Sequence, residues 1–134
     1  MAHSFPTRRS SDLATTAALI DEIPILSVLG ALSEEGLIVR DAGELRVKET
    51  DRIEAIAQNL RRMGITLTTS ESGLEIPGKQ KFHAAEVESL GDHRIAMAFS
   101  IAALTADGPC VIQDSGAASV SFPEFYTTLR NIAN

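Results

Sequence analysis

Stretches with apolar residues at helical spacing alternate along the chain with short apolar runs, and this alternation predicts an α/β fold. The first helix is expected to begin near Asp21, because Pro24 is tolerated only in a first turn, and to stop at Gly36. The run from Leu37 to Val39 is typical of a strand. The apolar face of this helix comprises Ile23, Leu26, Val28, Leu29 and Leu32.

The second helix is predicted to begin at Asp51, with Glu54 as its capping partner, and to end at Gly64. Its inward stripe comprises Ile53, Ile56, Ala57, Leu60 and Met63. Two short strands over residues 65–69 and 74–76 are expected on either side of a turn.

A third helix is predicted from Asp92 to the break at Gly108, and it is apolar nearly all round, so it should be buried. A strand over Cys110 to Ile112 follows, and then a last helix from Ser121 with Glu124 completing a capping box. The side chains expected to face inward from this last helix are Phe125, Leu129 and Ile132. Helices that open on aspartate at 21, 51 and 92 suggest a repeated α/β unit of uneven period.

Composition restricts the class of protein. The 134 residues, 44% of them hydrophobic, suffice for one domain with its own core. The formal net charge of −6 argues against general nucleic-acid binding. The single Cys110 excludes an internal disulfide and a cysteine-based zinc site, and no apolar run approaches the roughly 20 residues of a membrane span. We therefore expect a cytoplasmic protein that binds neither nucleic acid nor membranes.

The beginning of the chain differs from the rest. His3 to Leu13 shows neither helical nor strand periodicity, and Pro6 with Arg8 and Arg9 is typical of a solvated tail. The segment also resembles one reading frame of a common sequencing adapter. We therefore predict a non-native tail over residues 1–13, with natural residues missing before the domain. A basic arm that binds phosphate is the alternative.

Charged residues concentrate at two of the predicted helix starts. One cluster runs from Arg46 to Arg52 and includes Lys48, and the other is Asp92-His93-Arg94. A helix N-terminus suits phosphate or carboxylate, because it presents unpaired N–H groups and a partial positive charge. Cations there oppose the helix dipole at roughly 0.3–1 kcal/mol each. An anionic ligand at that place would offset this cost.

The same residues also allow a purely structural explanation. Three aspartates are explained as helix N-caps, namely Asp21, Asp51 and Asp92. Three cations are equally explained as surface charges or ion-pair partners, namely Lys48, Arg52 and Arg94. His83, which follows Lys81 and Phe82 in a polar stretch, is expected to be an exposed loop residue.

The run Leu-Arg-Val-Lys-Glu-Thr-Asp-Arg at 45–52 closely resembles the signature of the shikimate-pathway enolpyruvyl transferases, the 5-enolpyruvylshikimate-3-phosphate synthase family (3-phosphoshikimate 1-carboxyvinyltransferase). Segments 21–24, 92–98 and 121–125 resemble the same family in order and spacing. The resemblance extends from about Ala14 to the C-terminus, whereas the sister enzymes that act on a UDP-sugar lack the Lys-Glu-Thr-Asp-Arg run.

The resemblance implies transfer of the enolpyruvyl group of phosphoenolpyruvate to the 5-hydroxyl of shikimate 3-phosphate, with release of phosphate and without a metal or other cofactor. It implies that Asp21 is the base that also holds the shikimate hydroxyls, and that Glu49 is the acid. Lys48 would contact the phosphate of shikimate 3-phosphate. Arg52 and Arg94 would clamp the phosphoenolpyruvate carboxylate. His93 and Glu44 are implied only in supporting roles.

The resemblance also implies a lobe built from repeated α/β units, an inside-out α/β barrel. Residues 14–134 would supply about two of the three units of the C-terminal lobe, and the N-terminal lobe would be missing, so the chain alone is expected to be inactive. One departure concerns Val120, which stands where some relatives carry a phosphate-contacting lysine. The alternative function is a non-catalytic anion-binding or interaction module, which would not need an acid and a base.

Overall fold

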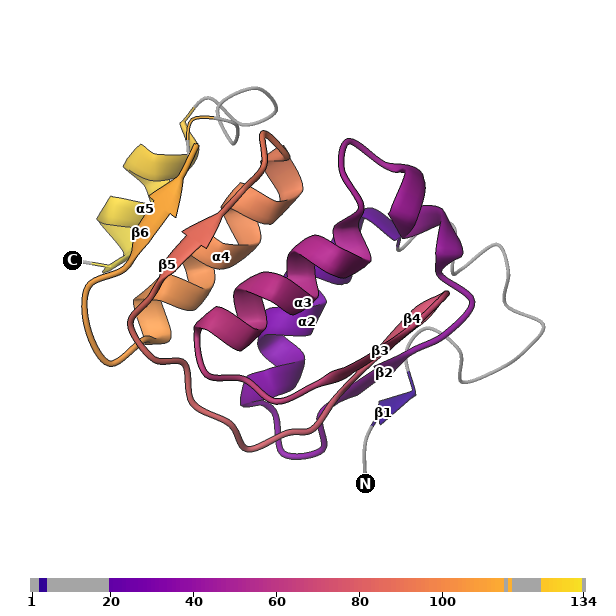
Figure 1. Ribbon diagram of the computed structural model, residues 1–134. Coiled ribbons are helices and arrows are strands. Elements are labelled where there is room, and N and C mark those ends of the chain that lie inside the picture. Colours follow the sequence, from indigo (N-terminus) through magenta and orange to yellow (C-terminus); the bar gives the residue numbers. More distant parts are fainter. Residues whose placement is uncertain (1–2, 5–19, 115, 117–123, 134) are drawn as a thin grey trace.

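The computed structural model describes residues 3–4, 20–114, 116 and 124–133. Three helices lie side by side at the centre, with a sheet on either side of the group (Figure 1). They are α2 (Ile23–Leu32), α3 (Arg52–Arg62) and α4 (His93–Thr105). A further helix, α5 (Phe125–Ala133), lies beside α4, and its Phe125 packs on Ala96 of that helix.

The larger sheet has the strand order β1-β2-β4-β3. β2 (Leu37–Val39) and β3 (Thr68–Ser70) each pair antiparallel with β4 (Gly73–Ile76). Leu37 lies opposite Ile76 and Val39 opposite Leu74, and all four side chains are buried in the main core. The strands predicted in these regions are therefore confirmed. The strand predicted over residues 65–69 is β3, which is shorter than expected.

β1 (His3–Ser4) pairs in parallel with β2. The sequence predicted no strand between residues 3 and 13, so this two-residue pairing is a difference from the expectation. Residues 5–13 lie outside the described part of the chain. The prediction that residues 1–13 are a non-native tail remains a prediction.

The smaller sheet consists of two parallel strands, β5 (Glu86–Glu88) and β6 (Val111–Gln113). Sequence reasoning did not predict β5, because it has a single apolar residue, Val87, between two glutamates. Its other edge is satisfied by a side chain of α3: the Asn59 amide donates to the Glu88 carbonyl at 2.7 Å and accepts from the Glu88 N–H at 3.0 Å. A side-chain amide thus takes the place of a neighbouring strand.

Two of the three predicted aspartate caps are confirmed. Asp51 accepts the Glu54 N–H at the start of α3, and Asp92 accepts the Arg94 and Ile95 N–H groups at the start of α4. The cap predicted for Asp21 is wrong. That residue lies within a short 3-10 helix, η1 (Ile20–Glu22), which runs directly into α2.

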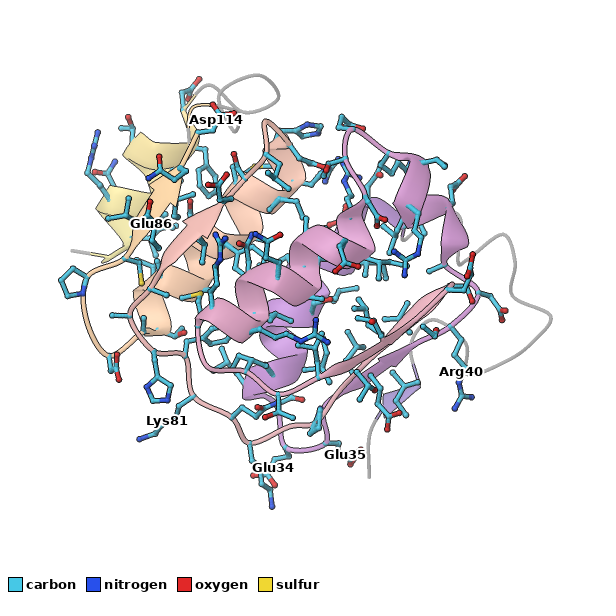
Figure 2. The ribbon with its side chains drawn as sticks, in the orientation of Figure 1. Glu34, Glu35, Arg40, Lys81, Glu86 and Asp114 are labelled. Carbon is cyan, nitrogen blue, oxygen red and sulfur yellow. The ribbon has the colours of Figure 1, made fainter. Side chains whose placement is uncertain are left out.

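The polar surface agrees with the prediction, whereas four apolar side chains that were predicted to be buried are exposed. Charged side chains such as Glu34, Arg40 and Lys81 point away from the core (Figure 2). The exposed loop position expected for His83 is confirmed, since its imidazole pairs with Asp107 at 2.7 Å and is largely exposed. The four exposed apolar side chains are Leu29 (49%), Leu32 (39%) and Ile132 (74%), which were predicted to face inward, and Leu104 (49%), which belongs to the helix predicted to be buried all round.

The predicted start of the last helix at Ser121 lies outside the described residues, and the described part of that helix begins at Phe125. Among the described residues, the longest and most apolar helices are too short to cross a membrane.

Candidate active site

The candidate residues meet because η1, α3 and α4 all begin at the same end of the molecule. Asp21 lies on η1, and His93 lies in the first turn of α4. Lys48 and Glu49 lie in the segment between the 3-10 helix η2 (Gly43–Val47) and the start of α3 at Arg52. The structure brings these five side chains, which come from three separate segments, into one ion-pair network.

Arg52 is the centre of this network. Its side chain is 1% exposed, and its guanidinium group contacts three carboxylates. Nε and Nη2 donate to Asp92 at 2.7 and 3.1 Å, Nη1 donates to Asp21 at 3.0 Å, and Nη2 donates to Glu49 at 2.9 Å. Burial lowers the pKa of Arg52, but the adjacent Asp92, Glu49 and Asp21 more than reverse this effect, so its pKa is raised and it stays charged.

Asp92 is the residue that sequence reasoning undervalued, because it was explained as a helix cap alone. Its side chain is fully buried, both of its oxygens accept from Arg52, and Oδ1 also accepts from the first N–H groups of α4. A buried arginine requires a buried anion, so Arg52 could have indicated such a partner. The sequence alone does not say which carboxylate supplies it.

Asp21 contacts two cations. Its Oδ1 lies 3.4 Å from Lys48 Nζ and 3.0 Å from Arg52 Nη1. Partial burial raises the pKa of Asp21, but the charges and hydrogen bonds of Lys48 and Arg52 outweigh it, and the pKa is lowered overall. Asp21 is therefore an ionised carboxylate at neutral pH.

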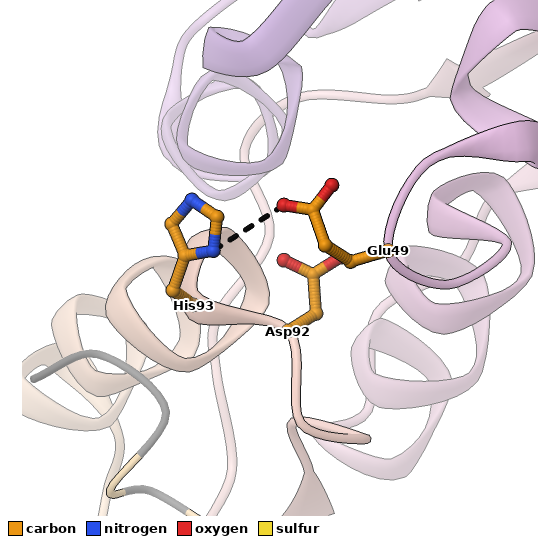
Figure 3. Close-up of side chains that lie close together, drawn as sticks. All are labelled: Glu49, Asp92 and His93. Carbon is orange, nitrogen blue, oxygen red and sulfur yellow. Dashed lines mark ion pairs between the residues drawn. The ribbon is translucent and has the colours of Figure 1, made fainter. Parts of the chain in front are cut away.

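Glu49, Asp92 and His93 lie together, as Figure 3 shows, and the first two both bind Arg52. His93 Nδ1 is 3.3 Å from Glu49 Oε2, and the three groups offer ligand atoms that all lie within 4.8 Å of one another. This is a donor set that could hold a metal ion. However, both Asp92 oxygens already accept from Arg52, and a guanidinium group in this position would repel a cation. The contacts are explained as an ion-pair network.

Arg94 lies apart from the Arg52 network. Its Nη1 is 3.3 Å from Glu22 Oε1, and its buried Nε has no partner among the described residues. Arg94 borders a cavity of ≈270 Å³ between α2, α4 and α5, which is otherwise mainly apolar. The predicted pairing of Arg52 with Arg94 is therefore indirect: Asp92 binds the Arg52 side chain and the Arg94 backbone N–H.

The remaining residues considered for the site lie outside the Arg52 network or outside the described part of the chain. Glu44 is exposed on η2 and is not part of the network that the described residues form. Val120 lies outside the described residues. Arg46, to which sequence reasoning assigned no role of its own, donates to the carbonyls of Ser70 and Glu71 at 2.7 and 2.8 Å and to Asp51 at 2.9 Å. It therefore fastens the segment before Lys48 to the β3–β4 turn.

Comparisons with known proteins agree with this arrangement. Residues 9–129 match the family model described as EPSP synthase (3-phosphoshikimate 1-carboxyvinyltransferase). A protein of that name from Solibacter usitatus is 66% identical over 118 residues, 88% of this chain and 28% of the relative. Another from Koribacter versatilis is 50% identical over 117 residues, 87% of this chain and 27% of the relative.

A solved structure of EPSP synthase from Acinetobacter baumannii superposes with a TM-score of 0.81 at 42% identity, over 90% of this chain and 28% of that one. The predicted α/β fold and its family resemblance are therefore confirmed. The chain spans about 28% of the length of the first of these relatives, so it corresponds to a part of their structure. On its sequence and its fold, the chain belongs to the EPSP synthase family of 3-phosphoshikimate 1-carboxyvinyltransferases.

Proposed function

We propose that this chain supplies part of the active site for transfer of the enolpyruvyl group from phosphoenolpyruvate to the 5-hydroxyl of shikimate 3-phosphate, a step of aromatic amino acid biosynthesis. In the addition step the hydroxyl oxygen bonds to C2 of phosphoenolpyruvate while the methylene carbon gains a proton. In the elimination step the bond to phosphate breaks, the methyl carbon loses a proton, and the double bond is restored. Neither step requires a redox change.

Asp21, Lys48 and Glu49 are assigned the acid–base and phosphate-binding roles. Asp21 takes the hydroxyl proton: it is ionised at neutral pH and so can accept one, although its lowered pKa makes it a weaker base than an ordinary aspartate. Glu49, when protonated, gives its proton to the methylene carbon, and His93, 3.3 Å from it, supports it. Lys48 binds the phosphate of shikimate 3-phosphate beside Asp21, from which it lies 3.4 Å away.

One observation carries this proposal: the carboxylates proposed as base and acid, Asp21 and Glu49, come from separate segments and both bind the buried Arg52, and Lys48 lies beside Asp21. A module that only binds anions would need the cations. Carboxylates paired with those cations would compete with its ligand and would serve no purpose there. The same contacts imply a movement. Because Arg52 is 1% exposed and bonded to Asp21 and Glu49, a substrate carboxylate reaches it only when one of these two side chains moves aside.

Catalysis is proposed to need a partner, the remaining part of an EPSP synthase. Positioning two anions in a cleft from which water is excluded requires groups on both sides of it. The cations of this site are already paired with carboxylates, so we expect further positive charge to come from outside the described residues. We also propose a cytoplasmic location, in keeping with a single cysteine that has no disulfide partner in the chain.

The test is phosphate release from phosphoenolpyruvate that depends on shikimate 3-phosphate. The purified 134-residue chain should show no turnover alone, and turnover should appear when the separately expressed N-terminal part of the Solibacter usitatus relative is added. In that mixture Asp21→Asn should abolish turnover, whereas Asp107→Asn, which alters exposed contacts with His83 and the Ala84 N–H, should leave it unchanged.

Two results would contradict the proposal. Robust turnover by the chain alone would show that no partner is needed. Binding of each substrate without mutual enhancement, and without phosphate release in the mixture, would instead support the non-catalytic anion-binding module.

A further inference from the structure

Asp92 makes contacts with two helices at once. Its Oδ2 accepts from Arg52 Nε at 2.7 Å, and its Oδ1 accepts from Arg52 Nη2 at 3.1 Å and from the Arg94 N–H at 2.9 Å. The side chain is fully buried, so water does not compete for these bonds. A single carboxylate therefore determines the orientation of the Arg52 guanidinium group and the place at which α4, with Arg94 in its first turn, begins.

The other partners of Arg52 are of a different kind. Asp21 and Glu49 are 43% and 47% exposed and bind Nη1 and Nη2, whereas Asp92 binds Nε and shares Nη2 with Glu49. An incoming carboxylate can replace an exposed partner at low cost in desolvation, but not a buried one. Asp92 is thus the fixed partner, and Asp21 and Glu49 are the exchangeable ones.

Asp51 provides an internal comparison. It also caps a helix, through the Glu54 N–H, and it also binds an arginine, Arg46, at 2.9 Å. Arg46 binds backbone carbonyls of the β3–β4 turn, however, and does not belong to the Arg52 network. If Asp92 acted only as a cap, replacing either aspartate would have the same kind of effect.

We infer that Asp92 is a positioning residue for substrate: it holds Arg52 so that the guanidinium edge formed by Nη1 and Nη2 faces the exchangeable side, where it receives the carboxylate of phosphoenolpyruvate. This inference rests on the proposed function for the identity of the substrate. The orientation of Arg52 by Asp92 does not depend on that function, and the two can be tested separately.

The experiment uses the complete 134-residue chain labelled with ¹⁵N, and follows the Arg52 Nε–H resonance by NMR. Asp92→Ser is the main variant, because serine keeps the helix cap while removing the contact with Arg52. Asp51→Ser is the matched control. We expect the Arg52 Nε–H to shift and to exchange faster with solvent in Asp92→Ser, and to remain as in the wild type in Asp51→Ser.

Phosphoenolpyruvate is then titrated into the same samples. Its apparent Kd should rise by about tenfold or more in Asp92→Ser, as expected for loss of a charged hydrogen-bond geometry, and should stay within about twofold in Asp51→Ser. The affinity for shikimate 3-phosphate should change less, since Lys48 does not contact Asp92. Absence of any response to phosphoenolpyruvate in the wild type would count against the proposed function, while the Arg52 resonance would still decide the role of Asp92.

Three results would overturn the inference. One is an Arg52 Nε–H unchanged in folded Asp92→Ser, and another is an equal effect of Asp51→Ser. If Asp92→Ser does not fold, the exchange rate of the Arg52 Nε–H in the wild type provides the third test. A rate as fast as that of exposed Arg40 would exclude the positioning role.

Discussion

Burial of Arg52 is possible only because carboxylates surround its guanidinium group. A buried ion pair is weak evidence for net stability, since removing two charges from water offsets most of their attraction. Removing one partner is a different matter, because an uncompensated charge remains in the interior. Arg52 and Asp92 should therefore be far more sensitive to substitution than Arg94, whose side chain is one-third exposed and has one 3.3 Å ion pair.

Arg52→Lys tests whether the stability of the fold depends more on Arg52 than on Arg94. Lysine keeps the charge but cannot form the paired contacts to Asp92, so the free energy of unfolding should fall by about 2–4 kcal/mol. Arg94→Lys, the control with the same chemical change, should cost less than about 1 kcal/mol. Urea unfolding of the three proteins measures both values, and equal losses would show that Arg52 is not the buried centre of the network.

Asp21 should make the free energy of unfolding depend on pH in the acidic range. Its pKa is lowered in the folded chain, despite the opposing effect of burial, by Lys48 and Arg52. The folded state therefore binds the proton less readily than the unfolded state, and the stabilisation is present above the ordinary value of 3.8 and is lost as the pH falls through the lower folded pKa.

The measurement is the free energy of unfolding between pH 6 and pH 2. We expect Asp21→Asn to flatten the decline below about pH 4 and to be less stable than the wild type near neutral pH. An unchanged acid dependence in Asp21→Asn would mean that the contacts of Asp21 with Lys48 and Arg52 do not persist in solution.

At the scale of elements, α2 and α4 present apolar side chains at matching positions. On α2 they are Ile25, Leu29 and Leu32, and on α4 they are Met97, Ile101 and Leu104; each set recurs at intervals of four and then three residues. None of these six side chains is fully buried, and the cavity of ≈270 Å³ opens between the two helices. Both helices are therefore more apolar than the described structure around them requires.

This surface should make the isolated chain self-associate, because large contiguous apolar patches are rare on monomeric proteins. Leu29→Glu combined with Leu104→Glu should reduce association in sedimentation velocity, while changing the free energy of unfolding by less than about 1 kcal/mol. Val111→Glu, at an apolar residue of β6 that is 56% exposed, is the control and should leave association unchanged. Equal association of all three proteins would exclude this surface as the cause.

At the scale of the whole molecule, the core is continuous from the larger sheet through α3 to α4. Among the described residues, His3 and Ser4 of β1 pair with β2, and the match to the family model begins at residue 9. Most of the stability should therefore come from residues 20–114, where the buried side chains are concentrated.

Deleting residues 1–13 tests the prediction of a non-native tail. The thermal midpoint should change by less than about 4 °C, since only a two-residue pairing is known to be lost. Differential scanning calorimetry of the two proteins provides the measurement. A fall of many degrees would mean that the segment packs on the domain and would contradict its assignment as a tail.

Local physical chemistry accounts for what the sequence alone determined. The starts of α3 and α4, with Asp51 and Asp92 as caps, depend on bonds that span only two or three positions, so they can be recognised from neighbouring residues. The strand Leu37–Val39 and the stripe of α3 follow in the same way from spacing. The signature at 45–52, with Asp21 and Arg94, indicated the family by resemblance.

Only the tertiary structure decided which of these distant segments contact one another. Arg52 and Asp92 are 40 positions apart, and no local rule states which carboxylate will neutralise a buried arginine. For the same reason Asp21 was mistaken for a helix cap, although its partners, Lys48 and Arg52, lie in another segment. Strand β5, with one apolar residue, exists because Asn59 and β6 satisfy its backbone, and the exposure of Leu29 and Ile132 depends on which surfaces the rest of the chain covers. These features depend on pairing and burial between distant segments, which become defined only when the chain folds.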